Sequence, residues 1–376
     1  MPANRGAAIV VGGSLVGLPL AIALARRGIA VTVLEQTVGD ERGGAGLGVE
    51  RDLYARLAGV DPRTSELVPA MPVIRTSRET STWYAIRSWL LAVVARTPGI
   101  EIHAGRRVVE VRDGAQRAVA RTLDGTTFEA DVVLGADGYR SVVRAAVDPA
   151  RQHARYGGFV LWRGLPHEAW LPEAMWRARQ LGGGRQPIPE TARLVAYHVP
   201  GPHGETAPGS RQITFAWYDG SRTAWLRERG LLVGDEVRSS VTLDDTLRAE
   251  LRAIAPARWP GTPAAAAIVA ALDRNVAFGT PLAEYLPERL ASGRVAMLGD
   301  AAHVSSPMVG AGLITGLLDA LAIATYVDDE GGVRGAAGAR ALRRYQTARL
   351  DEDREQVQVS MDATRDLLRT ARVRDS

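Results

Sequence analysis

A cluster of small residues near the N-terminus has the spacing of a dinucleotide-binding turn. The segment VVGGSLVGL places Gly12 at the first glycine position, followed by Gly13, with Ser14 at the second position and Gly17 at the third. The first glycine permits a tight strand-to-helix turn, the second position brings the backbone close to a pyrophosphate, and the third lets helix and strand pack closely. Glu35 ends the next predicted strand, where a carboxylate can accept hydrogen bonds from ribose hydroxyls. The pattern predicts a nucleotide cofactor, either NAD or FAD; an ordinary glycine turn is the alternative.

Two later segments also place an acid in a turn after a predicted strand. In GADGYRSVVR (135–144) the turn contains Asp137 and Gly138, and in VAMLGDAAHVSSPMVGAGLITGLLDA (295–320) it contains Asp300. An acid in such a turn either accepts hydrogen bonds from ligand hydroxyls or holds the turn through backbone N–H groups. Because apolar sequence surrounds Asp300, an unpaired carboxylate there would be costly, and we expect a partner for it.

These three segments, in this order and separation, closely resemble the signature motifs of the single-component FAD-dependent aromatic hydroxylases, the para-hydroxybenzoate hydroxylase-like family. The segments YGGFVLWRG (156–164), AYHVPG (196–201) and ITFAWYDG (213–220) are similar to the branch that contains 2,6-dihydroxypyridine 3-hydroxylase. The resemblance implies non-covalent FAD as cofactor. It also implies NADPH or NADH as a transient co-substrate, O2, and a small aromatic or heteroaromatic substrate.

The resemblance also assigns roles to residues. Asp137 and Gly138 correspond to the segment that contacts FAD, and Asp300 to the acid that binds its ribityl chain or ribose. Arg87 resembles the arginine near the FAD pyrophosphate, with a solvated helix arginine as the alternative. The loop beside the isoalloxazine ring corresponds to Pro307, Gly310, Gly312 and Leu313. His303 follows the same motif, where a structural role is expected.

By this resemblance the protein is an FAD-dependent NAD(P)H:oxygen monooxygenase. Reduced flavin in this family adds O2 to form a C4a-hydroperoxide, which an electron-rich ring attacks. The sequence has no second strand-linked glycine fingerprint, and this fits transient binding of NAD(P)H. A flavin-dependent oxidase or reductase on the same fold and a non-catalytic flavoprotein are the alternatives.

Three polar residues of the predicted substrate sheet are candidates for activating a phenol or hydroxypyridine. Tyr197 and His198 are adjacent on one predicted strand, so they face opposite sides of the sheet and at most one faces the pocket. Tyr218 ends another strand. His198 is the favoured proton acceptor, because an ordinary histidine titrates near ~6.5. A satisfied structural histidine is the alternative.

Composition excludes several other chemistries. The 376 residues contain no Cys, and all 46 basic residues are Arg, so thiolate and lysine Schiff-base chemistry are excluded. The six His are scattered, and no metal site is expected. Arginines alternate with acids at a net charge of +4, so nucleic acid is not an expected partner. The uncharged stretch 6–25 is interrupted by glycines and Pro19, which argues against a membrane span; we expect a cytoplasmic protein, with the oligomeric state open and a homodimer as one alternative.

The elements that must position these residues follow from hydrophobic patterning. Buried strands are predicted at 7–11, 30–35 and 294–298, helices at 83–96, 310–327 and 339–369, further strands at 100–103, 107–111, 117–122 and 131–135, and antiparallel strands at 156–163, 193–199 and 211–218. We therefore predict an α/β protein whose Rossmann-like FAD-binding domain has a parallel sheet. That domain comprises 1–150 with 280–330, a mainly antiparallel β-sheet substrate domain is inserted at 151–279, and 331–376 form a C-terminal helical segment.

Overall fold

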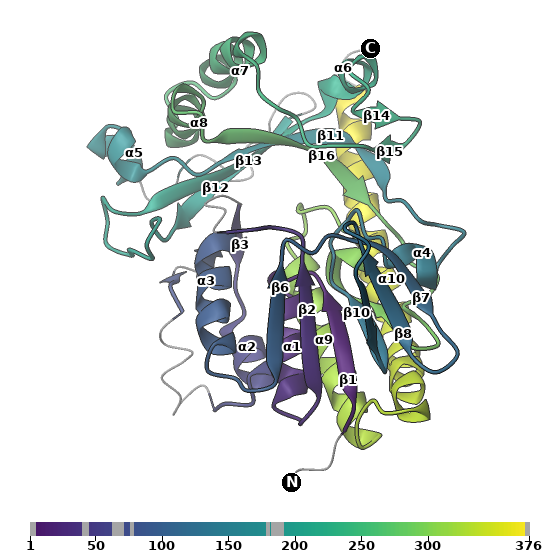
Figure 1. The fold of residues 1–376 in the computed structure, drawn as a ribbon. Helices are drawn as coiled ribbons and strands as arrows, with labels where there is room; N and C mark the ends of the chain where they lie inside the picture. The colour runs from purple at the N-terminus through teal and green to yellow at the C-terminus, as the bar shows by residue number, and fades with distance from the viewer. Residues whose placement is uncertain are drawn as a thin grey trace.

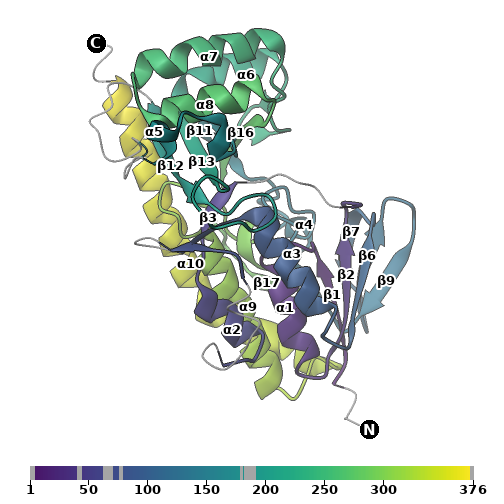
Figure 2. The ribbon, with the colours of Figure 1, turned by 90° about the vertical axis from the view of Figure 1, so that its left-hand side faces the viewer.

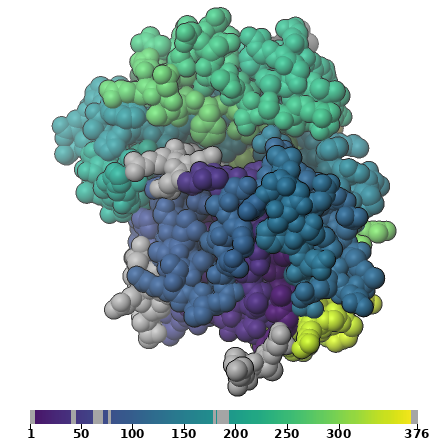
Figure 3. Space-filling view, in the orientation of Figure 1, coloured from purple at the N-terminus to yellow at the C-terminus, as the bar shows by residue number. Residues whose placement is uncertain are grey.

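The computed structural model describes residues 5–39, 45–61, 71–75, 79–177, 181 and 192–372. The chain folds into a lower body built on a parallel sheet and an upper body built on an antiparallel sheet, as Figure 1 shows. Figure 3 shows the green and teal surface of the upper body directly above the purple and blue surface of the lower body.

The parallel sheet is the centre of the lower body. Its strand order is β17-β18-β10-β1-β2-β6, in which only β17 runs antiparallel to its neighbour. The strands are β1 (Ala7–Val11), β2 (Ala30–Glu35), β6 (Ile100–Ala104), β10 (Val132–Gly135), β17 (Ala291–Ser292) and β18 (Val295–Met297). The strands β1 and β10 are apolar and almost wholly buried, as expected for central strands covered on both faces. Because β17 and β18 come from far along the chain, this body is discontinuous in sequence.

Helices cover one face of the parallel sheet and a small sheet covers the other (Figure 2). The helices are α1 (Gly17–Ala25), α2 (Arg51–Leu57), α3 (Trp83–Val94) and α9 (Gly312–Asp329). The opposite face carries an antiparallel sheet of β7 (Val108–Asp113), β8 (Ala118–Thr122) and β9 (Thr127–Ala130); the short helix α4 (Arg144–Val147) lies beside β7. A third small sheet consists of β3 (Gly46–Gly48), β4 (Ile74–Arg75) and β5 (Glu79–Thr82).

The upper body is an antiparallel sheet with helices on its outer side. Its strands are β11 (Arg155–Gly164), β12 (Ala192–Val199), β13 (Gln212–Asp219), β14 (Leu232–Val233), β15 (Glu236–Val237) and β16 (Ala277–Glu284). The helices are α5 (Glu173–Trp176), α6 (Thr223–Glu228), α7 (Asp245–Arg258) and α8 (Pro263–Asp273). Helices α7 and α8 lie above the sheet in Figure 1, which leaves its other side turned toward the lower body. We call that side the inner face.

Strand register decides which residues belong to the inner face. Directly paired residues of antiparallel strands share a face, and alternate residues along one strand do so too. Arg163 of β11 pairs with Ala216, and Leu161 pairs with Tyr218. Tyr197 of β12 pairs with Thr214, two positions before Ala216. These side chains therefore lie on one side of the sheet. On that side Phe159, Leu161 and Tyr218 pack with Leu282 of β16, and Met308 from a loop of the lower body packs against them.

The long helix α10 (Ala336–Arg372) runs along both bodies, in yellow in Figure 1. It packs against α9 below and β11 above, and Leu367 and Leu368 reach the inner-face cluster. None of the described helices is long and apolar enough to cross a membrane.

The predicted fold class is confirmed: a parallel-sheet body, an antiparallel-sheet body and a C-terminal helix are all present. Strands predicted at 7–11 and 30–35 have the same bounds in the structure. The helix predicted from 310 begins at Gly312 instead, because Gly310 has a φ of +66° and ends the preceding turn. The sequence analysis did not predict α7, α8 and β16. The domain boundaries remain a prediction.

Candidate functional site

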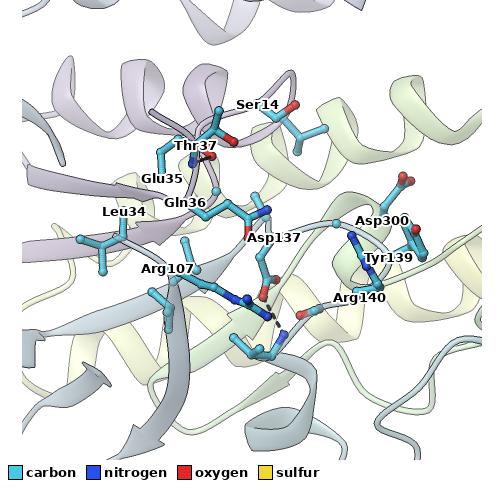
Figure 4. A pocket seen from close by; sticks show the side chains of 18 of the residues that line it. Ser14, Leu34, Glu35, Gln36, Thr37, Arg107, Asp137, Tyr139, Arg140 and Asp300 are labelled. Carbon is cyan, nitrogen blue, oxygen red and sulfur yellow. Dashed lines mark hydrogen bonds between the residues drawn. The ribbon is translucent and has the colours of Figure 1, made fainter. Parts of the chain in front are cut away.

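A cavity of about 1020 Å³ lies at the carboxyl ends of the central parallel strands. This is the edge at which open α/β sheets bind ligands. Its lining includes most of the residues that the three motifs predict: Gly12, Ser14, Glu35, Arg87, Asp137, Gly138, Asp300, Gly312 and Leu313. Figure 4 shows Glu35, Asp137 and Asp300 in this cavity, although they come from three separate parts of the chain.

The turn between β1 and α1 is made by glycines that no other residue could replace without strain. Gly12 has a φ of +102°, and a Cβ there would lie 2.3 Å from the carbonyl oxygen of Ala136. A Cβ at Gly17 would lie 2.0 Å from the carbonyl oxygen of Gly12. Backbone is on the other side of both contacts, so neither neighbour can move away cheaply. The turn has the close backbone geometry that a pyrophosphate cradle requires.

Glu35 closes this turn from the neighbouring strand. One carboxylate oxygen accepts a hydrogen bond from the N–H of Gly13 at 2.7 Å, and the other accepts one from the N–H of Thr37 at 2.8 Å. Glu35 therefore holds the glycine turn against the end of β2. The binding of ribose hydroxyls by Glu35 remains a prediction. Its position in the cavity wall would allow that contact.

Arg87 lies at the same turn rather than in solvent. Its Nε donates to the carbonyl oxygen of Gly13 at 3.1 Å, and its guanidinium carbon lies 5.6 Å from the ring centroid of Trp83. The Trp83 indole in turn donates to the hydroxyl of Ser14 at 3.0 Å. The first turns of α3 thus place the Arg87 cation beside the predicted pyrophosphate position. The alternative of a solvated helix arginine does not describe this contact.

Asp137 has one satisfied and one unsatisfied oxygen. Its Oδ2 accepts from the N–H groups of Val142 at 2.8 Å and Val143 at 3.3 Å, which stabilises the turn after β10. Its Oδ1 is buried and has no hydrogen-bond partner among the residues that the structure describes. Burial raises the pKa of Asp137, against the effect of these hydrogen bonds. Gly138 follows with a φ of +77°, which turns the chain along the cavity wall. A carboxylate with a spare oxygen fits the hydroxyls of a bound dinucleotide.

Asp300 projects into the cavity from the turn after β18. Its side chain is exposed to the cavity, and desolvation by the surrounding cavity walls raises the pKa of Asp300 against the attraction of His303, Arg144 and Arg163. The turn is held by Arg144, whose Nη2 donates to the carbonyl oxygen of Asp300 at 3.0 Å and whose Nη1 donates to that of Tyr139 at 3.0 Å. Arg144 therefore joins the two acidic turns.

Arg144 was not among the predicted site residues, although it ends the second motif. The residue is wholly buried, and its guanidinium carbon lies 4.0 Å from the ring centroid of Tyr285. The signal available in the sequence was an arginine at the end of the second motif, between apolar residues.

The loop between Asp300 and α9 contains the remaining predicted FAD residues. Pro307 is exposed, and its carbonyl oxygen accepts from the N–H of Gly310 at 3.1 Å. Gly312 is the first residue of α9, and Leu313 follows it in the cavity wall. The N-terminus of α9 therefore points its free N–H groups toward the cavity, where they favour negative charge.

His303 belongs to a buried ionic network behind this loop. Its Nε2 lies 2.6 Å from Oδ2 of Asp319, whose other oxygen accepts from Nε of Arg349 at 3.2 Å. Arg349 also pairs with Asp353. Burial opposes protonation of His303, but the Asp319 carboxylate outweighs it and raises the pKa of His303 to about 9.

The same network resembles a metal site in composition only. Ligand atoms of His303, Asp319 and Asp353 lie within 4.8 Å of one another. The Arg349 guanidinium contacts both carboxylates and already supplies the positive charge between them. A structural role, as expected for His303, agrees with this geometry.

The three candidate activating residues do not lie together. Tyr197 and Tyr218 are on the inner face, and burial raises the pKa of each to about 12. His198 is on the opposite face, because it pairs with Ile213, which packs under α8. Alternation along β12 therefore places Tyr197 and His198 on opposite sides of the sheet, as predicted from their adjacent positions.

His198 is engaged by a buried acid. Its Nδ1 lies 2.7 Å from Oε1 of Glu168, and Nη2 of Arg211 lies 2.7 Å from the same oxygen. Burial and the Arg211 cation lower the pKa of His198, against the opposing pull of Glu168. This arrangement matches the alternative of a structural histidine, and it gives His198 no access to the cavity side of the sheet.

Comparisons with known proteins agree with this geometry. Residues 265–360, which include the Asp300 turn and α9, match the FAD binding domain family. Aurachin C monooxygenase/isomerase of Stigmatella aurantiaca is 26% identical over 91% of this chain and 85% of its own length. The 2,6-dihydroxypyridine 3-monooxygenase of Paenarthrobacter nicotinovorans is 26% identical over 90% of this chain and 86% of its own.

Solved structures show the same fold. The 2,6-dihydroxypyridine-3-hydroxylase from Arthrobacter nicotinovorans superimposes with a TM-score of 0.75 at 21% identity, covering 94% of this chain and 91% of that chain. Together these similarities confirm the resemblance to FAD-dependent aromatic hydroxylases. They also confirm the predictions of an enzyme of that type and of FAD as its cofactor.

Proposed function

We propose that the protein uses FAD, NADH or NADPH, and O2 to hydroxylate a small aromatic or heteroaromatic molecule of the phenolic or hydroxypyridine kind. The observation that carries this proposal is a contact between the inner face and the loop that follows Asp300. Met308 of that loop packs with the inner-face cluster of Phe159, Leu161 and Tyr218, so a ring placed there would be close to the cavity that Asp300 lines.

The relatives' names support this substrate class, since one of them acts on 2,6-dihydroxypyridine. In the proposed reaction one oxygen atom of O2 enters the ring, the other leaves as water, and the nicotinamide coenzyme supplies two electrons. Bound FAD supplies the activation of O2, which is the cofactor's own chemistry.

The chain's own residues have three tasks in this reaction. Arg144 keeps the Asp137 and Asp300 turns at a fixed separation, through its hydrogen bonds to both segments. Phe159, Leu161 and Leu282 form an apolar group that excludes water from the inner face. Tyr197 and Tyr218 remain neutral near pH 7, since the pKa of each is raised to about 12, so each phenol can donate a hydrogen bond to a ring oxygen.

The test is a screen of phenols and hydroxypyridines with the purified FAD-loaded protein. We expect one or more compounds to accelerate NADH or NADPH oxidation and to yield a product heavier by one oxygen atom. The proposal fails if no compound in such a panel gains oxygen.

The screen also separates the two alternatives. An oxidase or reductase would oxidise its substrate or coenzyme, with peroxide formed and no oxygen inserted. A non-catalytic flavoprotein would show no stimulation of flavin reduction by any ring compound.

A further inference from the structure

The last turns of α10 lie against the inner face of the antiparallel sheet. Figure 2 shows α10 rising along the lower body and continuing beside the upper body. Near its end, Leu367 and Leu368 pack against the inner-face cluster, whose buried members are Phe159, Leu161, Tyr218 and Leu282. A helix from the far end of the chain therefore contributes side chains to the face that the proposed function assigns to the substrate.

Two glycines of β11 make room for this packing. The register between β11 and β16 shifts where they lie, as it does at a β-bulge. Gly158 has a φ of +90°, and a Cβ on it would lie 2.8 Å from Cδ1 of Leu368. A Cβ on Gly157 would lie 2.1 Å from Cδ2 of Leu282. The strand thus lacks side chains at the two positions where these leucines approach its backbone.

Buried hydrogen bonds hold this end of α10 on two sides. The hydroxyl oxygen of Ser360 accepts from the N–H of Ser306, in the loop after Asp300, at 2.6 Å. One turn later the hydroxyl of Thr364 donates to Oε1 of Glu284 on β16 at 2.7 Å. All four bonded residues are buried, and buried polar groups are costly to leave unpaired. These bonds therefore fix the leucines that follow relative to both the loop and the sheet.

The loop that Ser360 contacts also borders the cofactor cavity. Asp300 and Gly312, at the two ends of this loop, line the cavity. Met308 of the same loop packs against the inner-face cluster, as Leu368 does. The α10 leucines, the loop and the cluster therefore meet at one place beside the cavity.

We propose that Leu368 is a specificity-determining residue that limits the size of the aromatic substrate. A ring between the inner face and the Met308 loop would have the side chain of Leu368 at its border. Because protein interiors are close-packed, the volume of that side chain sets how far the ring system can extend toward α10. This inference rests on the proposed function, because it assumes that the substrate ring lies against the inner face.

The experiment measures ligand binding to the FAD-loaded protein without turnover, from changes in the visible absorbance of bound FAD. Two pairs of probes differ by one fused benzene ring: phenol with 2-naphthol, and 4-hydroxypyridine with 4-hydroxyquinoline. The quantity compared between proteins is the ratio of the two dissociation constants within a pair. A variant that is only less stable would weaken both probes of a pair equally, so this ratio separates a specificity role from a structural one.

Variants of Leu368 decide whether this side chain is responsible. Leu368→Ala should shift the ratio about tenfold toward the two-ring probe, because the added ring gains apolar burial in the space released. Leu368→Phe should shift it in the opposite direction, because a bulkier side chain takes space away. Leu350→Ala truncates a leucine of the same helix that packs against a different hydrophobic cluster, and it should keep the wild-type ratio. Should Leu368→Ala fail to fold, Leu368→Val gives the same comparison with a smaller shift.

The proposal is overturned if the smaller side chain at position 368 leaves the ratio unchanged, if Leu368→Ala and Leu368→Phe shift it in the same direction, or if Leu350→Ala shifts it equally. Failure of all four probes to bind any of these proteins would overturn it too. FAD content and oxygen insertion are measured separately on each protein. Oxygen insertion with an unchanged ratio would refute this inference alone, whereas failure of oxygen insertion with every compound would refute the proposed function.

Discussion

At the scale of single residues, the cavity contains carboxylates whose hydrogen bonds the protein leaves incomplete. Within the described part of the chain Oδ1 of Asp137 has no hydrogen-bond partner, and desolvation by the cavity walls raises the pKa of Asp300. Structures rarely keep such groups unless a ligand completes their hydrogen bonding. The hydroxyls of a dinucleotide's sugars are suitable donors, so both acids fit the FAD assignment.

Glu35 differs from these acids because it already accepts two backbone hydrogen bonds. We expect Glu35→Ala to weaken FAD binding at least about tenfold, since hydrogen bonds to a charged acceptor contribute ~1.5 to 3 kcal/mol each. Titration of the FAD-free protein by flavin fluorescence measures this effect. Glu355→Ala, at an exposed position of α10, is the matched control. Equal affinities for the two variants would remove Glu35 from the site.

The opposite faces of β12 predict different results for its two neighbouring polar residues. Tyr197→Phe and Tyr218→Phe should lower the yield of hydroxylated product per coenzyme oxidised and raise peroxide formation. His198→Gln should keep wild-type coupling, because His198 contacts Glu168 on the other face. Product and peroxide are measured side by side. Uncoupling by His198→Gln alone would show that a group on the outer face activates the substrate.

At the scale of elements, the Asp300 turn is held from behind by two helices. Asp319 of α9 accepts a hydrogen bond from the N–H of Gly299 at 3.1 Å, and Arg349 of α10 pairs with both Asp319 and Asp353. The network thus connects α9, α10 and the turn that carries Asp300. Because His303, Asp319, Arg349 and Asp353 are all buried, loss of one partner would leave a buried charge unpaired.

This network makes stability depend on pH. The pKa of His303 is raised to about 9 in the folded state. A raised pKa means that the stabilisation is fully present below the unfolded value of ~6.5 and is lost as pH rises through the folded value. The free energy of unfolding should therefore fall between about pH 6.5 and 9, by up to about 1.4 kcal/mol per pH unit.

Urea unfolding at a series of pH values measures this slope. His303→Gln, which cannot titrate, should show a flatter dependence over the same range. If the wild type and His303→Gln give parallel curves, His303 is not protonated in the folded protein at neutral pH.

At the scale of the whole molecule, the cofactor site depends on segments that are far apart in the chain. The cavity is lined by the turn after β1, the turn after β10 and the turn after β18, and α10 braces both bodies. Binding at such a site couples to global stability, because a ligand that binds only the folded state stabilises it by mass action.

We expect FAD to be bound non-covalently, since the chain contains no Cys and the cavity wall offers carboxylates, arginines and helix N-termini that can hold a dinucleotide through hydrogen bonds. Heat denaturation should release yellow flavin into the supernatant. Excess FAD, at about 100 times its dissociation constant, should stabilise the FAD-free protein by about 2.7 kcal/mol and raise its Tm. Flavin that remains with the precipitated protein would contradict this expectation.

Elements with local signals were predictable from the amino-acid sequence. An apolar run that ends before Gly12 predicted β1, and a run rich in β-branched residues that ends in Glu35 predicted β2, both with their observed bounds, because a central parallel strand is largely buried. The glycine spacing also identified the cofactor turn, since the close contacts at Gly12 and Gly17 exclude any side chain. The helices α7 and α8 had weaker signals that were available, namely caps at Asp244 and Thr262.

Which polar side chains come into contact depends on how the two bodies pack together. Alternation along β12 required Tyr197 and His198 to diverge, but the side that faces the cofactor depends on how the whole sheet packs on the lower body. Likewise Arg144, Arg163 and Asp300 are separated in the chain and come together through strand order and register. Such contacts carry no local sequence signal, because their energy arises from burial and charge between distant segments.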